Sequence, residues 1–242
     1  MYLSRVVPAA LTSALVAVLT GCFSSSSGAA ADETAAATDS PSTRAVKVVE
    51  PAPAPTPPEP TPKKTSTRTQ TSTMSIPSIG LEDLRVVPYK GTTDDWPGTR
   101  IQNEGVAASP YGDGGGVGPG EVGNHLVTAH RISFGGPLRD LPAVEKGDSV
   151  LITSGGKVYE YKITETRETS FRSPQSLTEQ RAAVPGRPGE RATRAMITIS
   201  TCATPEDTAA GNHWRDDRGN PEHRIDKVGV LAETREAPST SP

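Results

Sequence analysis

Short runs of alternating apolar and polar residues dominate the last two thirds of the chain. In the run that ends at Cys202, isoleucines at positions 197 and 199 alternate with Thr198 and Ser200. Successive side chains of a strand point to opposite faces, so this run predicts a strand with its isoleucines in a core and its Ser200 and Cys202 side chains on the other face. Similar patterns predict further strands at residues 75–81, 85–89, 124–131, 149–153, 157–164 and 224–232.

Turn signals separate these strands, and helix signals are few. A Ser-Gly-Gly tripeptide at 154–156 is typical of a tight hairpin. The glycine-rich segment 111–123 and the polar stretch around Trp96 predict loops. One short helix is predicted at 177–183, with Ser173 as its cap. Many short strands with so little helix favour an antiparallel barrel or sandwich.

The first 22 residues have the features of an export signal. Arg5 precedes an apolar run that is shorter than the roughly 20 residues of a membrane-spanning helix. The run ends in Leu-Thr-Gly-Cys, which resembles the bacterial lipobox and makes Cys22 the lipidated residue. Residues 1–22 are therefore predicted to be a lipoprotein signal peptide, and an uncleaved N-terminal membrane helix is the alternative.

Composition divides the rest of the chain. Residues 23–73 are rich in Ser, Ala, Thr and Pro. Such a segment can bury too little apolar surface to offset the conformational entropy that it would lose on folding. We therefore predict a disordered linker at 23–73, one folded domain at 74–235 and a disordered tail at 236–242.

Charge and cysteine content narrow the choice of function. The formal net charge is −3 and no dense block of Lys and Arg occurs, which argues against a nucleic-acid partner. The chain has 2 cysteines, so lipidation of Cys22 leaves Cys202 without a disulfide partner. An odd cysteine in an exported protein indicates a reactive thiol, and a buried, inert thiol is the alternative.

Three residues at the edges of predicted strands suggest acyl-transfer chemistry. They are His130, Cys202 and Arg224. A thiol nucleophile needs a proton donor and acceptor, and the carbonyl oxygen that gains charge needs a positive group beside it. The simpler alternatives are that His130 caps a strand and that Arg224 forms a surface ion pair with Asp226.

Several motifs together resemble those of the sortase family. They are Thr-Ala-His-Arg at 128–131, Ile-Ser-Thr-Cys-Ala-Thr-Pro at 199–205 and His-Arg-Ile at 223–225, with Gly-Asp at 147–148 and Tyr-Glu-Tyr at 159–161. The actinobacterial class E sortases are most similar. Ala129 stands where that class commonly has glycine, and a lipid anchor would replace the usual membrane helix.

The resemblance implies a mainly β fold, a closed barrel of about eight strands with one or two short helices. It implies a cysteine transpeptidase in which Cys202 attacks the threonine carbonyl of a C-terminal sorting signal. His130 would be the general acid and base, and Arg224 would stabilise the oxyanion. The implied partners are exported proteins with Leu-Ala-X-Thr-Gly or Leu-Pro-X-Thr-Gly signals and a peptidoglycan precursor amine. No cofactor is implied.

The polar segment 205–221 joins the strands of Cys202 and Arg224 and should border the site. We expect Thr201, His213 and Trp214 to contact substrate. A metal site built from His213 and nearby acids is the weaker interpretation, so no metal is predicted.

The non-enzyme alternative is a β-barrel surface lipoprotein that binds a peptide or glycan. An L,D-transpeptidase would need a His-Gly-Cys arrangement, which the sequence around Cys202 lacks.

Overall fold

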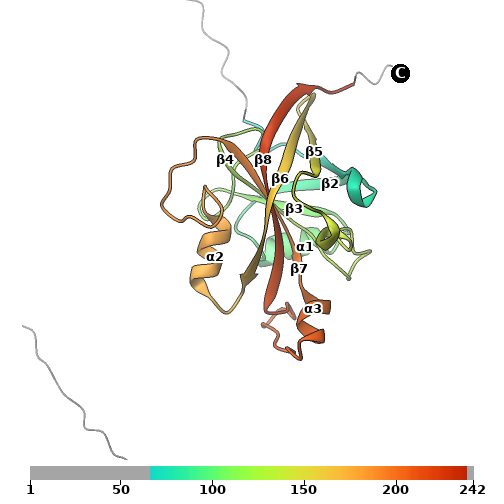
Figure 1. Cartoon of the computed structure of the whole chain (residues 1–242), viewed down its shortest axis with the longest axis vertical. Coiled ribbons are helices and arrows are strands. Elements are labelled where there is room, and N and C mark those ends of the chain that lie inside the picture. The colour runs from blue at the N-terminus through green and yellow to red at the C-terminus, as the bar shows by residue number, and fades with distance from the viewer. Residues whose placement is uncertain (1–65, 239–242) are drawn as a thin grey trace, which may run out of the picture. The chain divides into compact units, whose positions relative to one another are not determined.

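Eight strands close into a β-barrel in the computed structural model, which describes residues 66–238 (Figure 1). Around the barrel their order is β1-β2-β3-β4-β7-β8-β6-β5. The mainly β fold and the closed barrel expected from the sequence are thereby confirmed. The strands are β1 Ser72–Ile76, β2 Leu81–Lys90, β3 Ala107–Tyr111, β4 Gly123–Thr128, β5 Ser149–Ser154, β6 Lys157–Ser170, β7 Ala195–Cys202 and β8 His223–Glu236.

Short helices connect some of these strands. The α-helices are α1 Trp96–Gln102, α2 Pro174–Arg181 and α3 Thr204–Ala209, and the 3-10 turns are η1 Pro77–Ile79 and η2 Leu141–Ala143. In Figure 1, α2 lies beside the barrel, and α3 lies at the end opposite the C-terminal end of β8. Within residues 66–238, no helix has the length and apolar character needed to cross a membrane.

The alternating strands fill the barrel as their sequence pattern predicts. In β1 and β5 every second residue is buried. Ile197 and Ile199 of β7 are fully buried in the main apolar cluster. The opposite face of β7 is buried as well, because Gln180 of α2 covers it and donates a hydrogen bond to Ser200 at 3.2 Å. Cys202, at the end of the strand, is half-buried.

Two strand pairs depart from the antiparallel barrel that the sequence favours. β2 pairs with β3 in parallel, and β4 pairs with β7 in parallel. A parallel pair needs a crossover connection, and α1 provides it between β2 and β3.

The sequence prediction of a loop around Trp96 was wrong because α1 is short and has no apolar period. Its signals are local ones: Asp95 caps it by accepting from the Gly98 N–H at 2.8 Å, and Pro97 lies in its first turn.

Other boundaries also differ from the predicted ones. The run 75–81 is not one strand, since η1 separates β1 from β2 where Pro77 interrupts the ladder. β3 was not predicted, because Ala-Ala-Ser-Pro-Tyr has no alternation. α3 occupies the start of the polar segment 205–221, for which no helix was predicted.

The last residues of the predicted linker pack against the barrel. Arg68 forms an ion pair with Glu121 at 2.6 Å, and Glu121 also accepts from the Thr67 N–H at 3.2 Å. These contacts span more than 50 positions, so composition alone could not show them. The predictions for residues 1–65, including Cys22 and most of the linker, and for the last residues of the tail lie outside the described residues.

The buried β7 face gives a stability prediction. We expect Ile197→Ala to lower the free energy of unfolding by about 2–5 kcal/mol and Ile197→Val by about 0.5–1.5 kcal/mol, because each leaves a cavity in the core. Val122→Ala is the control, since Val122 is 58% exposed. Urea unfolding measures all three variants, and an Ile197→Ala loss no larger than that of Val122→Ala would contradict the described core.

Candidate active site

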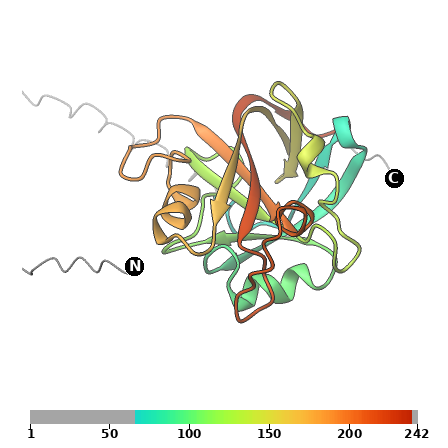
Figure 2. The same cartoon turned by 60° about the horizontal axis from the view of Figure 1, so that its bottom comes forward.

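The three predicted catalytic residues, His130, Cys202 and Arg224, lie at one end of the barrel. Cys202 is the last residue of β7, and its register partner on β8 is Arg224. His130 follows β4 by two residues. All three line one small cavity of about 10 Å³, with Asp94, Thr99, Gln102, Ala129, Ser200, Thr201 and Asn220. Figure 2 turns this end of the molecule, with α3 and the β7–β8 connection, toward the viewer.

Cys202 carries a free thiol and is half-buried. Burial raises the pKa of the Cys202 thiol, and the guanidinium of Arg224 opposes this rise. The carboxylate of Asp94 raises the thiol pKa further. The thiol is therefore protonated at neutral pH, and a thiolate forms only when a neighbouring group accepts the proton.

His130 is the neighbouring group that can accept this proton. Its Nε2 lies 2.8 Å from Oδ1 of Asn103, an acceptor, so Nε2 carries the hydrogen of the neutral ring. The ring stacks on Phe134 with centroids 5.2 Å apart and an interplanar angle of 24°. Burial lowers the pKa of His130, and Arg224 lowers it further. At neutral pH the ring is therefore a neutral base.

Arg224 is held deep in the site. Its side chain is 2% exposed, and its Nη2 donates to Oδ1 of Asp94 at 3.3 Å. Its guanidinium carbon lies 4.2 Å from the centroid of the Phe171 ring. Burial acts most strongly, and it lowers the pKa of Arg224. The charges of Asp94, Cys202 and Asp226 and the hydrogen bond to Asp94 together outweigh it, so the pKa is raised. A surface ion pair with Asp226 is excluded, because Asp226 is buried and accepts from Thr169 at 2.6 Å.

The remaining predicted residues have different positions. Thr201 lines the cavity, and its hydroxyl donates to the Ala129 carbonyl at 2.9 Å, which ties β7 to the segment of His130. Trp214 lies beside Arg172, whose guanidinium carbon is 5.9 Å from the ring centroid. His213 is exposed. Neither His213 nor Trp214 lines the cavity with Cys202.

Sequence reasoning missed three residues of the site. They are Asp94, Asn103 and Arg131. Arg131 forms an ion pair with Glu206 of α3 at 2.9 Å and donates to the Cys202 carbonyl at 3.4 Å. Its position directly after His130 was a usable signal. Asp94 and Asn103 lie far from their partners in sequence, and no local pattern marks them.

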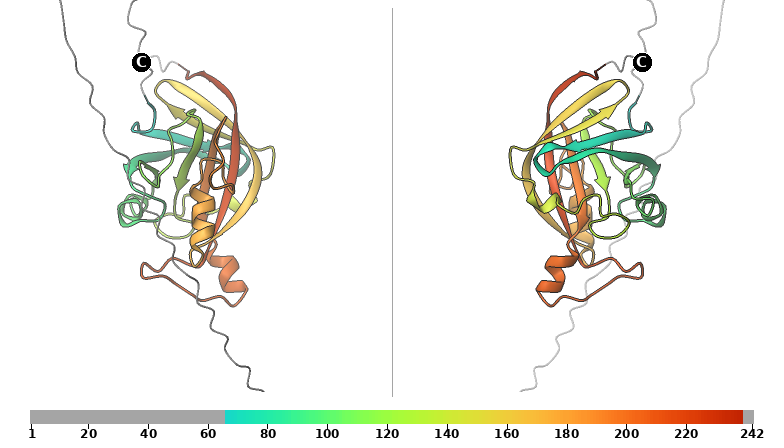
Figure 3. Two further views of the ribbon diagram at one scale, coloured as in Figure 1. Left: turned by 90° about the vertical axis from the view of Figure 1, so that its left-hand side faces the viewer. Right: turned by 90° about the vertical axis from the view of Figure 1, so that its right-hand side faces the viewer.

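The β7–β8 connection reaches across this end of the barrel (Figures 2 and 3). Arg218 donates to the Asp94 carbonyl at 2.9 Å, and its guanidinium carbon lies 5.6 Å from the centroid of the Trp96 ring. Asn220 of the same connection lines the cavity. The connection therefore covers the site and makes its cavity narrow.

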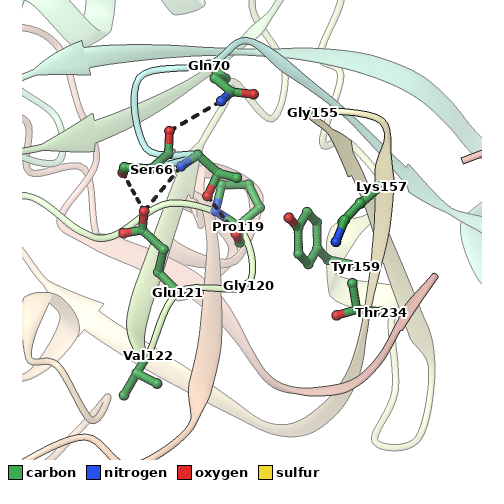
Figure 4. Close-up of a pocket in the computed structure, with 11 residues that line it drawn as sticks. Ser66, Gln70, Pro119, Gly120, Glu121, Val122, Gly155, Lys157, Tyr159 and Thr234 are labelled. Carbon is green, nitrogen blue, oxygen red and sulfur yellow. Dashed lines mark hydrogen bonds between the residues drawn. The ribbon is translucent and has the colours of Figure 1, made fainter. Parts of the chain in front are cut away.

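The larger cavities lie elsewhere. One of about 650 Å³ lies beside the β5–β6 turn and is lined by Tyr159, Lys157 and Glu121 among others (Figure 4). Lys157 starts β6, whereas Ser170 at the other end of β6 pairs with His223, so this cavity is far from Cys202. Another, of about 320 Å³, is lined by residues of the α2–β7 connection. Within residues 66–238, no three His, Cys, Asp or Glu side chains are placed to hold a metal ion.

Comparisons with known proteins identify relatives of this architecture. A family model described as the sortase domain matches residues 74–215. The SrtA sortase from Actinomyces oris superposes with a TM-score of 0.53 at 18% identity, covering 74% of this chain and 89% of its own. Sortase E from Streptomyces avermitilis superposes with a TM-score of 0.51 at 24% identity, covering 74% and 97%.

A further match is Sortase E1 from Streptomyces coelicolor, in a structure with a tripeptide in the active site. Its TM-score is 0.52 at 19% identity, and it covers 74% of this chain and 98% of its own. At these identities the structures show a shared fold. Among curated proteins, none matches the chain.

The electrostatics of the site predict how fast Cys202 reacts. We expect the rate of its alkylation by iodoacetamide to rise with pH at a midpoint above that of a thiol exposed to water, because burial disfavours the thiolate. The measurement uses the full chain with Cys22→Ser, so that Cys202 is the only thiol.

An unfolded peptide of residues 199–205 is the control, because it carries the same cysteine in water. A midpoint in the protein at or below that of the peptide would mean that Arg224 outweighs burial, contrary to the described site.

Proposed function

The chain belongs to the sortase family, and from this premise we propose that it is a cysteine transpeptidase acting on C-terminal sorting signals of exported proteins. One observation carries the proposal: Cys202, His130 and Arg224 line a single cavity at the end of three neighbouring strands. A thiol, a base and a fixed positive charge are the groups that acyl transfer through a thioester requires.

In the first half-reaction, the proton of Cys202 moves to His130 as Sγ attacks the threonine carbonyl carbon. The carbonyl oxygen becomes an oxyanion beside Arg224. When the bond to the following glycine breaks, His130 gives its proton to the leaving amine, and a thioester joins Cys202 to the threonine. The neutral thiol and neutral imidazole described above are the starting state for this transfer.

In the second half-reaction, an acceptor amine attacks the thioester. His130 takes the proton of the amine, an amide bond forms, and the sulfur leaves and recovers a proton. Arg224 stabilises the oxyanion in both halves. Its burial supports this role, because a fixed charge in a dry site stabilises developing charge more strongly than one in water.

The motifs around His130, Cys202 and Arg224 support a narrower proposal. Their similarity to actinobacterial class E sortases suggests Leu-Ala-X-Thr-Gly signals in preference to Leu-Pro-X-Thr-Gly, with a peptidoglycan precursor as acceptor. We place the enzyme on the outer face of the membrane, held by a lipid on Cys22 or, alternatively, by an N-terminal membrane helix. The linker then sets the distance between the domain and the membrane.

Substitutions in the purified protein test the mechanism with a signal peptide and an amine acceptor. Cys202→Ala should abolish transpeptidation, because no thioester forms. His130→Ala should lower kcat by about 10²–10⁴-fold. Arg224→Lys should lower it by about 10²–10³-fold, since a lysine cannot reproduce the planar guanidinium. Arg85→Lys is the control for the arginine, because Arg85 is exposed on β2. Product formation is followed by chromatography.

Turnover by the Cys202→Ala protein would overturn the mechanism. Tight binding of the peptide by the unmodified protein without any cleavage would instead support the non-catalytic binding protein.

A further inference from the structure

Two buried polar atoms at the active site have no partner within residues 66–238. They are Oδ2 of Asp94, an acceptor, and Nη1 of Arg224, a donor. Asp94 is 6% exposed and Arg224 is 2% exposed, and both line the cavity that contains Cys202. The other oxygen of Asp94 and the other terminal nitrogen of Arg224 bond to each other. One ion pair therefore has both an acceptor and a donor without a partner, and both of its residues line the cavity.

Buried polar groups in folded proteins nearly always have hydrogen-bond partners, so these two atoms are available to groups from outside the chain. An acceptor beside a donor matches the N–H and C=O groups of a peptide chain. We propose that Asp94 is a specificity-determining residue whose Oδ2 accepts a hydrogen bond from a donor of the sorting signal, while Nη1 of Arg224 donates to a carbonyl oxygen of the same peptide. The proposal rests on the proposed function.

The surroundings of Asp94 hold its backbone in place. Arg218 donates to its carbonyl, and the preceding Thr93 bonds to Gln180 and Arg181 of α2 at 3.0 and 2.8 Å. A group held this firmly loses little entropy when it binds a ligand. Asp94 also has a φ of 62°, which residues other than glycine seldom adopt. Such backbone strain is concentrated at functional sites.

The charge of Asp94 has two opposing effects on proton transfer from Cys202 to His130. It raises the pKa of the thiol, which disfavours the thiolate, and it raises the pKa of His130, which makes the ring a stronger base. Beyond these effects, Asp94 can contribute in two ways: by holding Arg224 in position, or by binding the substrate directly. The experiment separates them.

Asp94→Asn is the informative variant. Asparagine has nearly the same shape, accepts the left-handed backbone and keeps an oxygen for Arg224. It replaces the acceptor at Oδ2 with an NH₂ donor. The change in thiol pKa is the same for every peptide, so it cancels when substrates are compared. Asp113→Asn is the matched control, because Asp113 is exposed in the β3–β4 connection.

The substrates are a five-residue signal peptide and a series of analogues. Each analogue lacks one hydrogen-bond donor of the parent peptide. In each member an ester replaces one amide, or 2-aminobutyrate replaces the threonine. With the parent peptide, we expect Asp94→Asn in the full chain to lower kcat/KM by about ten- to a hundredfold, as for loss of a hydrogen bond to a charged group. With one analogue, Asp94→Asn should lower kcat/KM less than twofold, because that analogue already lacks the donor that Asp94 binds.

An equal loss with every peptide, or no loss at all, would overturn the proposal; the equal loss would leave Asp94 as a positioning residue for Arg224. Binding to the Cys202→Ala protein gives a second test that needs no change at Asp94. One modified peptide should bind at least about tenfold more weakly than the parent, and equal binding by the whole series would also overturn the proposal.

Failure of the proposed function has a different result. In that case the unmodified protein does not cleave the parent peptide and the Cys202→Ala protein does not bind it, which overturns both inferences. Cleavage of the parent peptide without a peptide-dependent effect of Asp94→Asn overturns only the role of Asp94.

Discussion

The position of β7 between β4 and β8 is the constraint on which the site depends. β4 and β7 run parallel, so their C-terminal ends lie at the same end of the barrel. β8 runs antiparallel to β7, so its first residues lie at that end too. His130, Cys202 and Arg224 follow or occupy these ends. Strand pairing thus brings residues up to 94 positions apart in sequence close to one cavity.

Burial then sets the chemistry of these residues. It disfavours the charged forms of both Cys202 and His130, so before the reaction the thiol and the imidazole are both neutral. Arg224 stays charged because Asp94 lies beside it. A buried guanidinium without such a partner would be strongly unfavourable. The carboxylate that permits a fixed positive charge in the site also opposes thiolate formation.

The sequence predicted the parts of the fold that depend on local pattern. β5 and β7 alternate clearly, and the hairpin between β5 and β6 has the glycines of a tight turn. β3 and α1 have neither alternation nor an apolar period, so the hydrophobic pattern did not predict them. For the site, a thiol without a disulfide partner, together with the motifs around it, pointed to Cys202 and its two partners. Asp94 contacts Arg224 across 130 positions, and only the closed barrel brings them together.

The most direct test of the account is to trap the proposed thioester. The full chain is mixed with a signal peptide, quenched in acid and digested with trypsin, and the fragment of residues 195–215 is examined by mass spectrometry. The account predicts that this fragment gains the mass of the signal peptide up to its threonine, on Cys202. Cleavage of the peptide with no adduct on Cys202, or with an adduct on another residue, would contradict it.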